Sequence, residues 1–162
     1  MLTAIISDTH MPRGARRLPD ACVERLRAAD LILHAGDVMT EEALADMEAI
    51  GPPLLAVHGN VDSAGLCTRL PAERIVEAER SRIAVVHDAG PARGRIERLR
   101  ARFPTAHAAV FGHSHLPLHE EAGGFQMFNP GSPTERRRAP VRTMGMARIE
   151  GDRIAFELVE LP

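Results

Sequence analysis

Two histidines, His113 and His115, come directly after the apolar run 108–111 and a single glycine. Imidazole is a common ligand of transition metals, so this pair indicates either a metal site or a turn that carries two surface histidines. Four other short apolar runs also end in polar residues that can bind metal. The candidate metal ligands behind the five runs are Asp8, His10, Asp37, Asn60, His87, His113 and His115.

Any one of these residues has an ordinary interpretation, because Asp and Asn are common in turns and most histidines are hydrogen-bonded loop residues. Their convergence is more informative. Oxygen and imidazole ligands without thiolate suit Mn, Fe, Zn, Co or Ni better than Ca or Mg. Seven ligands exceed the needs of one ion and are enough for two, if one carboxylate bridges them. Two ions about 3.5–4 Å apart can hold the attacking and leaving oxygens of a phosphoryl displacement.

The elements that must position these residues are short strands that alternate with helices. The apolar runs are 2–6, 31–33, 54–57, 83–86 and 108–111. Because these runs are continuous rather than alternating, they predict strands buried on both faces of a sheet. Amphipathic spacing predicts helices at 20–30, 40–50 and 94–103, of which the first has Asp20 as its N-cap and the second opens with Thr40 and acidic residues.

Two regions depart from this alternation and predict antiparallel pairing. Residues 74–87 indicate two strands joined by a tight polar turn. In the C-terminal third, the segments 123–129, 142–151 and 152–161 predict strands of an antiparallel meander that turns at 151–152. The chain is therefore expected to be an α/β protein with parallel and antiparallel pairing, in one mixed sheet or two facing sheets.

Length and composition are those of an ordinary globular domain, and we expect one domain over residues 1–162. A net charge of −2 gives no reason to expect nucleic acid or an anionic membrane as the main partner. No segment approaches the ~20 apolar residues of a membrane span, and the start of the chain lacks a signal-peptide pattern. A cytoplasmic location is the expectation. The sequence leaves open whether the chain forms a homo-oligomer.

The order of the motifs resembles the calcineurin-like metallophosphoesterase superfamily, and within it the small bacterial and archaeal phosphodiesterases. The motifs here are Asp8-Thr9-His10, Gly36-Asp37, Gly59-Asn60-Val61-Asp62, His87 and Gly112-His113-Ser114-His115, followed by Asn-Pro-Gly-Ser at 129–132. The resemblance implies an α/β fold with two facing mixed β-sheets flanked by helices. It also implies a small-molecule phosphate ester as substrate.

The resemblance further implies which residues bind each ion. One metal takes Asp8, His10, Asp37 and His115, and the second takes Asp37, Asn60, His87 and His113. A hydroxide that bridges the two ions would attack phosphorus in line. Two divalent transition ions are expected, with Mn the first choice and Fe, Zn, Ni and Co the alternatives. The candidate catalytic residues are Asp37, Asn60 and Asp62.

Two departures from the family pattern concern the proton that the leaving group needs. Much of the superfamily has a histidine after the asparagine of the third motif, whereas this chain has Val61. The fourth motif often continues as His-Gly-His, whereas here His87 is followed by Asp88. Asp62 is the nearest carboxylate, but beside two cations it is expected to stay ionised and to be a poor proton donor.

Two other functions are weighed against the phosphodiesterase. A non-catalytic scaffold on the same fold, as in the retromer-type relative of this superfamily, would not need all seven ligands. A nuclease is weakened by the negative charge and by the absence of Tyr and Trp for base stacking. The arginines at 13, 16 and 17 and at 136–138 can contact a substrate phosphate or lie in solvated loops.

Overall fold

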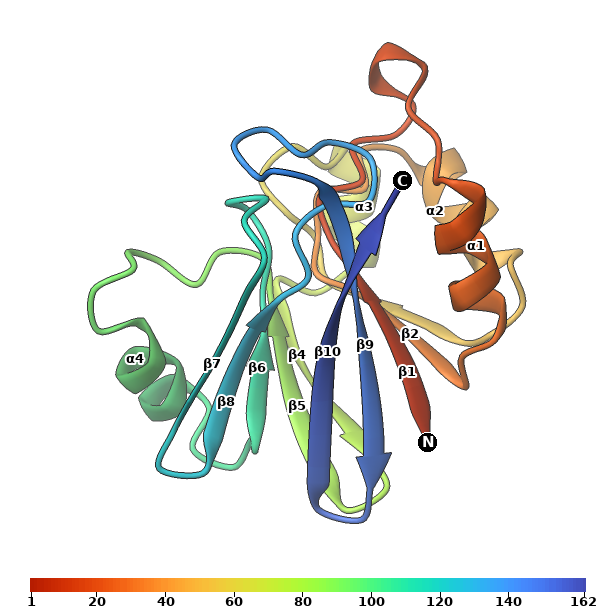
Figure 1. Cartoon of the computed structure of the whole chain (residues 1–162). Helices are drawn as coiled ribbons and strands as arrows, with labels where there is room; N and C mark the ends of the chain where they lie inside the picture. The colour runs from red at the N-terminus through yellow and green to blue at the C-terminus, as the bar shows by residue number, and fades with distance from the viewer.

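Ten strands form two mixed five-stranded sheets in the computed structural model, which describes residues 1–162 (Figure 1). Across the first sheet lie β10 (Arg153–Leu161), β9 (Arg142–Glu150), β1 (Leu2–Ile6), β2 (Leu31–His34) and β3 (Leu54–Ala56). Across the second lie β4 (Glu73–Ala78), β5 (Ser81–Val86), β6 (Ala108–Val110), β8 (Phe125–Asn129) and β7 (Leu118–Ala122). The pairs β1–β2, β2–β3, β5–β6 and β6–β8 are parallel, whereas β10–β9, β9–β1, β4–β5 and β8–β7 are antiparallel.

Helices cover the outer face of each sheet. The helices are α1 (Asp20–Arg27), α2 (Glu41–Glu48), α3 (Ala64–Arg69), α4 (Arg95–Arg102) and the short 3-10 turn η1 (Arg13–Ala15). One apolar cluster joins α1, α2 and α3 to the first sheet, a second lies between the two sheets, and a third joins α4 to the second sheet. The predicted fold of two facing mixed sheets flanked by helices is therefore confirmed. None of the helices is long and apolar enough to cross a membrane.

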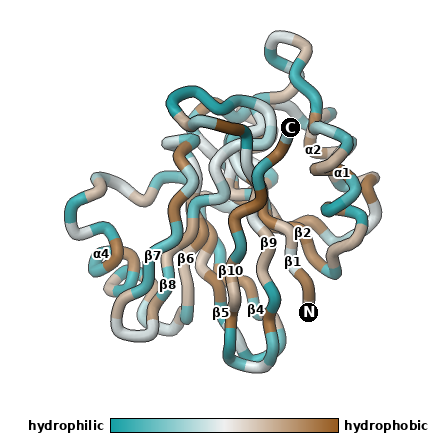
Figure 2. Tube along the Cα trace, in the orientation of Figure 1, coloured by the Kyte–Doolittle hydropathy of each residue, from teal (hydrophilic) through white to brown (hydrophobic).

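The continuous apolar runs are explained by burial on both faces, and Figure 2 shows the hydrophobic residues concentrated along the strands. In β1, Ala4 and Ile6 face the helices, whereas Ile5 faces the second sheet. In β5, Ile83 lies between the sheets and Ala84 packs towards α4. Fully burying an isoleucine side chain such as that of Ile5 or Ile83 stabilises the fold by roughly 1.5–3 kcal/mol.

The structure corrects two sequence predictions, the N-cap of α1 and the place of the segment 123–129. Asp20 is the first helical residue of α1 rather than its N-cap, which is Pro19. Thr40 caps α2, accepting from the backbone N–H of Ala43 at 3.2 Å. The segment 123–129 does not join the C-terminal meander. Its strand β8 pairs with β6 and β7 in the second sheet, and only β9 and β10 form the predicted hairpin around 151–152.

The carboxyl ends of β1 and β2 in one sheet and of β5 and β6 in the other meet at one edge of the sandwich, at the top of Figure 1. Backbone hydrogen bonds join the loops there. The N–H groups of Asp8 and His10 donate to the carbonyls of Gly36 and Asp37, each at 3.0 Å. The N–H of Gly112 donates to the carbonyl of His87 at 3.0 Å. These bonds join the loop after β1 to the loop after β2, and the loop after β6 to the loop after β5.

Candidate metal centre

The loops after β1 and β2 place two carboxylates and an imidazole at the centre of this edge. His10 Nε2 lies 3.3 Å from Asp37 Oδ2 and 3.9 Å from Asp8 Oδ1. All three side chains are buried, with exposed fractions of 3% or less. A buried carboxylate is costly unless a cation or hydrogen-bond donors face it, so two of them in one place indicate a site for positive charge.

The remaining candidates converge on the same two carboxylates. His115 Nε2 lies 3.3 Å from Asp8 Oδ1, and His87 Nε2 lies 3.2 Å from Asp37 Oδ2. Asn60 Oδ1 lies 3.1 Å from His87 Nε2 and 2.9 Å from His113 Nδ1. The structure thus brings all seven sequence candidates into one cluster.

Two overlapping groups of three side chains have ligand atoms within 4.8 Å of one another: Asp8, His10 and His115, and Asp8, Asp37 and His87. Asp8 is common to both groups. Asp37 Oδ2 contacts both His10 and His87, so either carboxylate is placed to lie between two ions.

The donor set fits divalent transition metals. His10 Nε2 and His115 Nε2 are buried without any hydrogen-bond partner, and each faces a carboxylate oxygen. An unpartnered buried polar atom is costly, whereas a metal ion between these nitrogens and the carboxylates would satisfy both. Imidazole nitrogen with carboxylate oxygen is the ligand chemistry of Mn, Fe and Zn sites.

The backbone is strained where the ligands lie. Nine non-glycine residues have positive φ, and five of them are candidate ligands, with φ between 48° and 68°. The five ligands are Asp8, His10, Asp37, His113 and His115. The left-handed conformation is unfavourable for residues with a Cβ, and such strain is concentrated at functional sites.

Carbonyl groups orient two of the imidazoles. His87 Nδ1 lies 2.7 Å from the carbonyl of Ala35, and His115 Nδ1 lies 3.1 Å from the carbonyl of Glu135. A carbonyl only accepts, so Nδ1–H is the donor in both rings, and Nε2 is the nitrogen left to face the carboxylates. This is the arrangement by which proteins fix a histidine to present one nitrogen to a metal.

The pKa values reflect the competition between burial and charge. Burial opposes the charged form of His10, but the carboxylates of Asp37 and Asp8 outweigh it and raise its pKa to about 9. The pKa of His87 is also raised, because Asp37 and Asp8 again outweigh burial. Burial would raise the pKa of Asp37, but the imidazoles of His10 and His87 lower it well below its usual range. For His115, burial prevails and lowers the pKa.

A fourth buried histidine supports the site without facing its centre. His34 Nδ1 accepts from the N–H of Gly36 at 3.1 Å, and its Nε2 lies 3.0 Å from Thr9 Oγ1. Complete burial lowers the pKa of His34 to about 4, so the ring is neutral and Nε2–H donates to Thr9. His34 therefore ties the loop after β1 to the loop after β2.

Asp62 contacts the backbone of the site. Its carboxylate accepts from the N–H groups of Gly59 at 2.6 Å, Met39 at 2.7 Å and Asp37 at 3.1 Å. These bonds connect the loop after β3 to the loop after β2 and hold Asn60 beside Asp37.

Sequence reasoning missed the residues that hold Asp8. Ser7 Oγ donates to Asp8 Oδ2 at 2.7 Å, and Ser132 Oγ donates to the carbonyl of Asp8 at 2.8 Å. Arg16, considered as a phosphate contact, forms an ion pair with Glu135 at 2.9 Å. The Asn-Pro-Gly-Ser motif was a signal for Ser132, whereas the contacts of Ser7 and Glu135 arise only from the fold.

Gly59 is required by the close approach of two loops. A Cβ at Gly59 would lie 2.6 Å from the backbone nitrogen of Asp37 and closer still to its carboxylate. We expect Gly59→Ala to displace Asp37 and to lower metal affinity by at least about tenfold. Gly65→Ala is the control, because its Cβ would meet only the movable end of the Glu41 side chain. Equal metal content in the two variants after dialysis would contradict this packing argument.

The raised pKa of His10 makes metal binding depend on pH. Because that pKa is about 9, His10 holds a proton at pH 7 in the metal-free protein and must release it to bind metal. Apparent affinity should therefore rise with pH below about 9, by about tenfold per pH unit for each proton released from His10 and His87, and level off above it. Calorimetry in buffers of different ionisation enthalpy counts the released protons. Affinity that is independent of pH between 6 and 9 would refute the prediction.

The model of the calcineurin-like phosphoesterase superfamily domain matches residues 1–152 of the chain. A probable metallophosphoesterase of Methanothermobacter thermautotrophicus is 35% identical over 162 residues, covering 98% of this chain and 92% of the relative. A probable metallophosphoesterase of Methanocaldococcus jannaschii is 32% identical over 166 residues, covering 99% of this chain and 82% of the relative.

Solved structures share the fold. The Vacuolar Protein Sorting 29 structure from Cryptosporidium parvum has a TM-score of 0.86 at 22% identity, covering 99% of this chain and 91% of that one. An archaeal phosphodiesterase has a TM-score of 0.76 at 17% identity, covering 98% of this chain and 100% of that one. At these identities the likeness concerns the fold alone.

Proposed function

The chain belongs to the calcineurin-like phosphoesterase superfamily, and from this membership we propose that it is a phosphodiesterase with two divalent metal ions. The observation that carries the proposal is the buried cluster in which the carboxylates of Asp8 and Asp37 face the unpartnered nitrogens of His10 and His115. Such a cluster is costly to a fold that does not bind metal. We further propose that residues 1–162 act as one domain and that Mn is the native metal.

The ligand sets we propose are those expected from the family pattern. One ion would be held by Asp8, His10, Asp37 and His115, and the other by Asp37, Asn60, His87 and His113. When bound, the two ions lower the pKa of water and neutralise charge on the phosphoryl oxygens.

The chain's own residues position that chemistry. The carbonyls of Ala35 and Glu135 hold the imidazoles of His87 and His115 with Nε2 directed inwards. Asp62 contributes by holding Gly59 and Asp37 together through their N–H groups. His113 and Asn60 are exposed, so the substrate phosphate approaches from their side.

A scaffold without catalysis is the second candidate, favoured by the structural likeness to Vacuolar Protein Sorting 29. The two functions make different demands on the cluster. A scaffold needs only its surface, whereas hydrolysis needs every buried ligand. Metal-dependent turnover therefore separates them.

The proposed function is tested by removing and restoring metal. Protein stripped with a chelator is expected to be inactive on bis(4-nitrophenyl) phosphate and to regain activity with Mn²⁺, with two ions per chain by elemental analysis. Hydrolysis of this diester should exceed that of the monoester 4-nitrophenyl phosphate. Two bound ions without hydrolysis of either ester would overturn the proposal in favour of the scaffold.

A further inference from the structure

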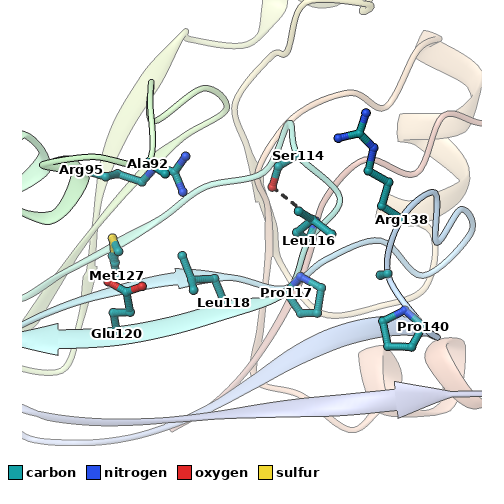
Figure 3. Close-up of a pocket in the computed structure, with 11 residues that line it drawn as sticks. Ala92, Arg95, Ser114, Leu116, Pro117, Leu118, Glu120, Met127, Arg138 and Pro140 are labelled. Carbon is teal, nitrogen blue, oxygen red and sulfur yellow. Dashed lines mark hydrogen bonds between the residues drawn. The ribbon is translucent and has the colours of Figure 1, made fainter.

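An apolar groove opens beside the metal centre, on the face of the second sheet that packs against α4 (Figure 3). Its volume is about 500 Å³, compared with about 280 Å³ for the polar cavity beside Asn60 and His87. Leu118 of β7 and Met127 of β8 form part of its apolar lining. The volume lies within the range of about 300–1,000 Å³ that is usual for small-molecule sites.

The groove is continuous with the candidate metal centre through one short segment. Ser114 lines the groove and lies between the two candidate ligands His113 and His115. Leu116, which follows His115, also lines the groove and is 42% exposed. His113, Ser114 and Leu116 form an exposed path from the metal ligands into the groove. A phosphate ester bound at His113 therefore has the groove within reach of one of its substituents.

The groove combines an apolar lining with three charged side chains, those of Arg95, Glu120 and Arg138. Leu116, Pro117 and Leu118 provide a contiguous apolar surface. Single exposed hydrophobic residues are ordinary on protein surfaces, but a contiguous apolar surface in a concave site is typical of a binding site. Of the three charged side chains, the guanidinium of Arg138 forms no ion pair or side-chain hydrogen bond with another residue of the chain. A planar guanidinium can stack on a flat ring and attract an anion.

We propose that this groove binds the retained ester arm of the substrate, and that the substrates are phosphodiesters with a flat apolar arm such as an aryl group. The inference rests on the proposed function. In the hydrolysis, the oxygen of water bonds to phosphorus and the bond to the leaving oxygen breaks. An aryl leaving group departs as its oxide, and the protons of water pass to the phosphate product and to solvent. The retained arm stays on the phosphate as a monoester and keeps its contacts with the groove.

Two diesters with the same leaving group isolate the retained arm. Phenyl 4-nitrophenyl phosphate and methyl 4-nitrophenyl phosphate both release 4-nitrophenolate, so their kcat/KM values differ mainly through the phenyl or methyl arm. Burying a phenyl ring is expected to favour the phenyl diester by about tenfold or more. Leu116→Ser and Arg138→Gln should each lower the phenyl-to-methyl ratio towards one. Leu158→Ser, which changes an exposed leucine on β10, should leave the ratio unchanged.

Product binding provides a second readout that does not depend on turnover. Phenyl phosphate is expected to shift the NMR methyl signals of Leu116, Leu118 and Met127 in the metal-loaded protein, whereas methyl phosphate is not. Equal kcat/KM for the two diesters, or methyl chemical shifts that do not change when phenyl phosphate is added, would overturn the groove assignment and leave the proposed function intact. Failure of the metal-loaded protein to hydrolyse either diester would overturn the proposed function, and with it this inference.

Discussion

Asp37→Asn is expected to lose both metal ions in part and to lower kcat/KM for an aryl diester by more than about a hundredfold. Removing a group that only supports a ligand typically costs 10–100-fold in affinity or activity, so losing the charge of a shared ligand should cost more. Asp37 Oδ2 lies 3.3 Å from His10 Nε2 and 3.2 Å from His87 Nε2, so one substitution removes negative charge next to ligands of both ions.

Asp37→Asn is a suitable test of the shared ligand because it conserves the shape of the loop. Asp37 Oδ1 accepts from the N–H of Val61 at 3.1 Å, and an asparagine can keep that bond through its own carbonyl. Asp46→Asn makes the same chemical change at an exposed position on α2 and should leave metal content at two ions. Elemental analysis and kinetics of the two variants are the measurement. An Asp37→Asn protein with full metal content and activity would refute the shared-ligand assignment.

The positions of the strands and the residues that follow them could be predicted because both depend on local signals. The run 31–33 is apolar at every position, and only a strand between two apolar layers buries every residue of so short a run. In parallel strands the carboxyl ends share an edge, so the residues after β1 and β2 converge in the first sheet, as do those after β5 and β6 in the second. The packing of the two sheets face to face then brings both sets together.

Other features of the fold depend on contacts between distant segments and left no local signal. Helix α3 has only six residues, too few for a periodic pattern, and it begins where Ser63 Oγ accepts from the N–H of Leu66 at 3.1 Å. The strand β8 has the same apolar character as the C-terminal strands. Its parallel pairing with β6 is decided by the packing of the second sheet against α4.

The supporting contacts of the metal centre were hidden for the same reason. Glu135 accepts a hydrogen bond from His115 through its backbone carbonyl, and the type of its side chain does not predict this role. The three backbone N–H groups that donate to Asp62 belong to residues three to twenty-five positions away in the sequence. Sequence order shows which residues can bind metal. The long-range contacts show which residues keep the ligands in place.

Val61 leads to the second large effect, which concerns the leaving group. The side chain of Val61 is 38% exposed beside the exposed ligand Asn60, and it can donate no proton. The carboxylate of Asp62 accepts from three backbone N–H groups. A departing alkoxide needs a proton, whereas an aryl oxide leaves as a stable anion. General acid assistance is worth on the order of 10²–10⁴-fold.

We therefore expect kcat to fall by on the order of 10²–10⁴-fold from aryl to alkyl phosphodiesters beyond the difference in their uncatalysed rates. Val61→His should recover part of the rate on alkyl diesters, because an exposed position accommodates the larger ring and the imidazole can donate a proton. Val61→Gln is the matched control, since its amide is polar and of similar reach but transfers no proton at neutral pH. The recovered rate in Val61→His should decline as pH rises through the pKa of the new imidazole, because only the protonated ring is an acid. Equal kcat for both substrate classes in the unmodified protein, or equal recovery in the glutamine variant, would show that the proton comes from a group other than residue 61.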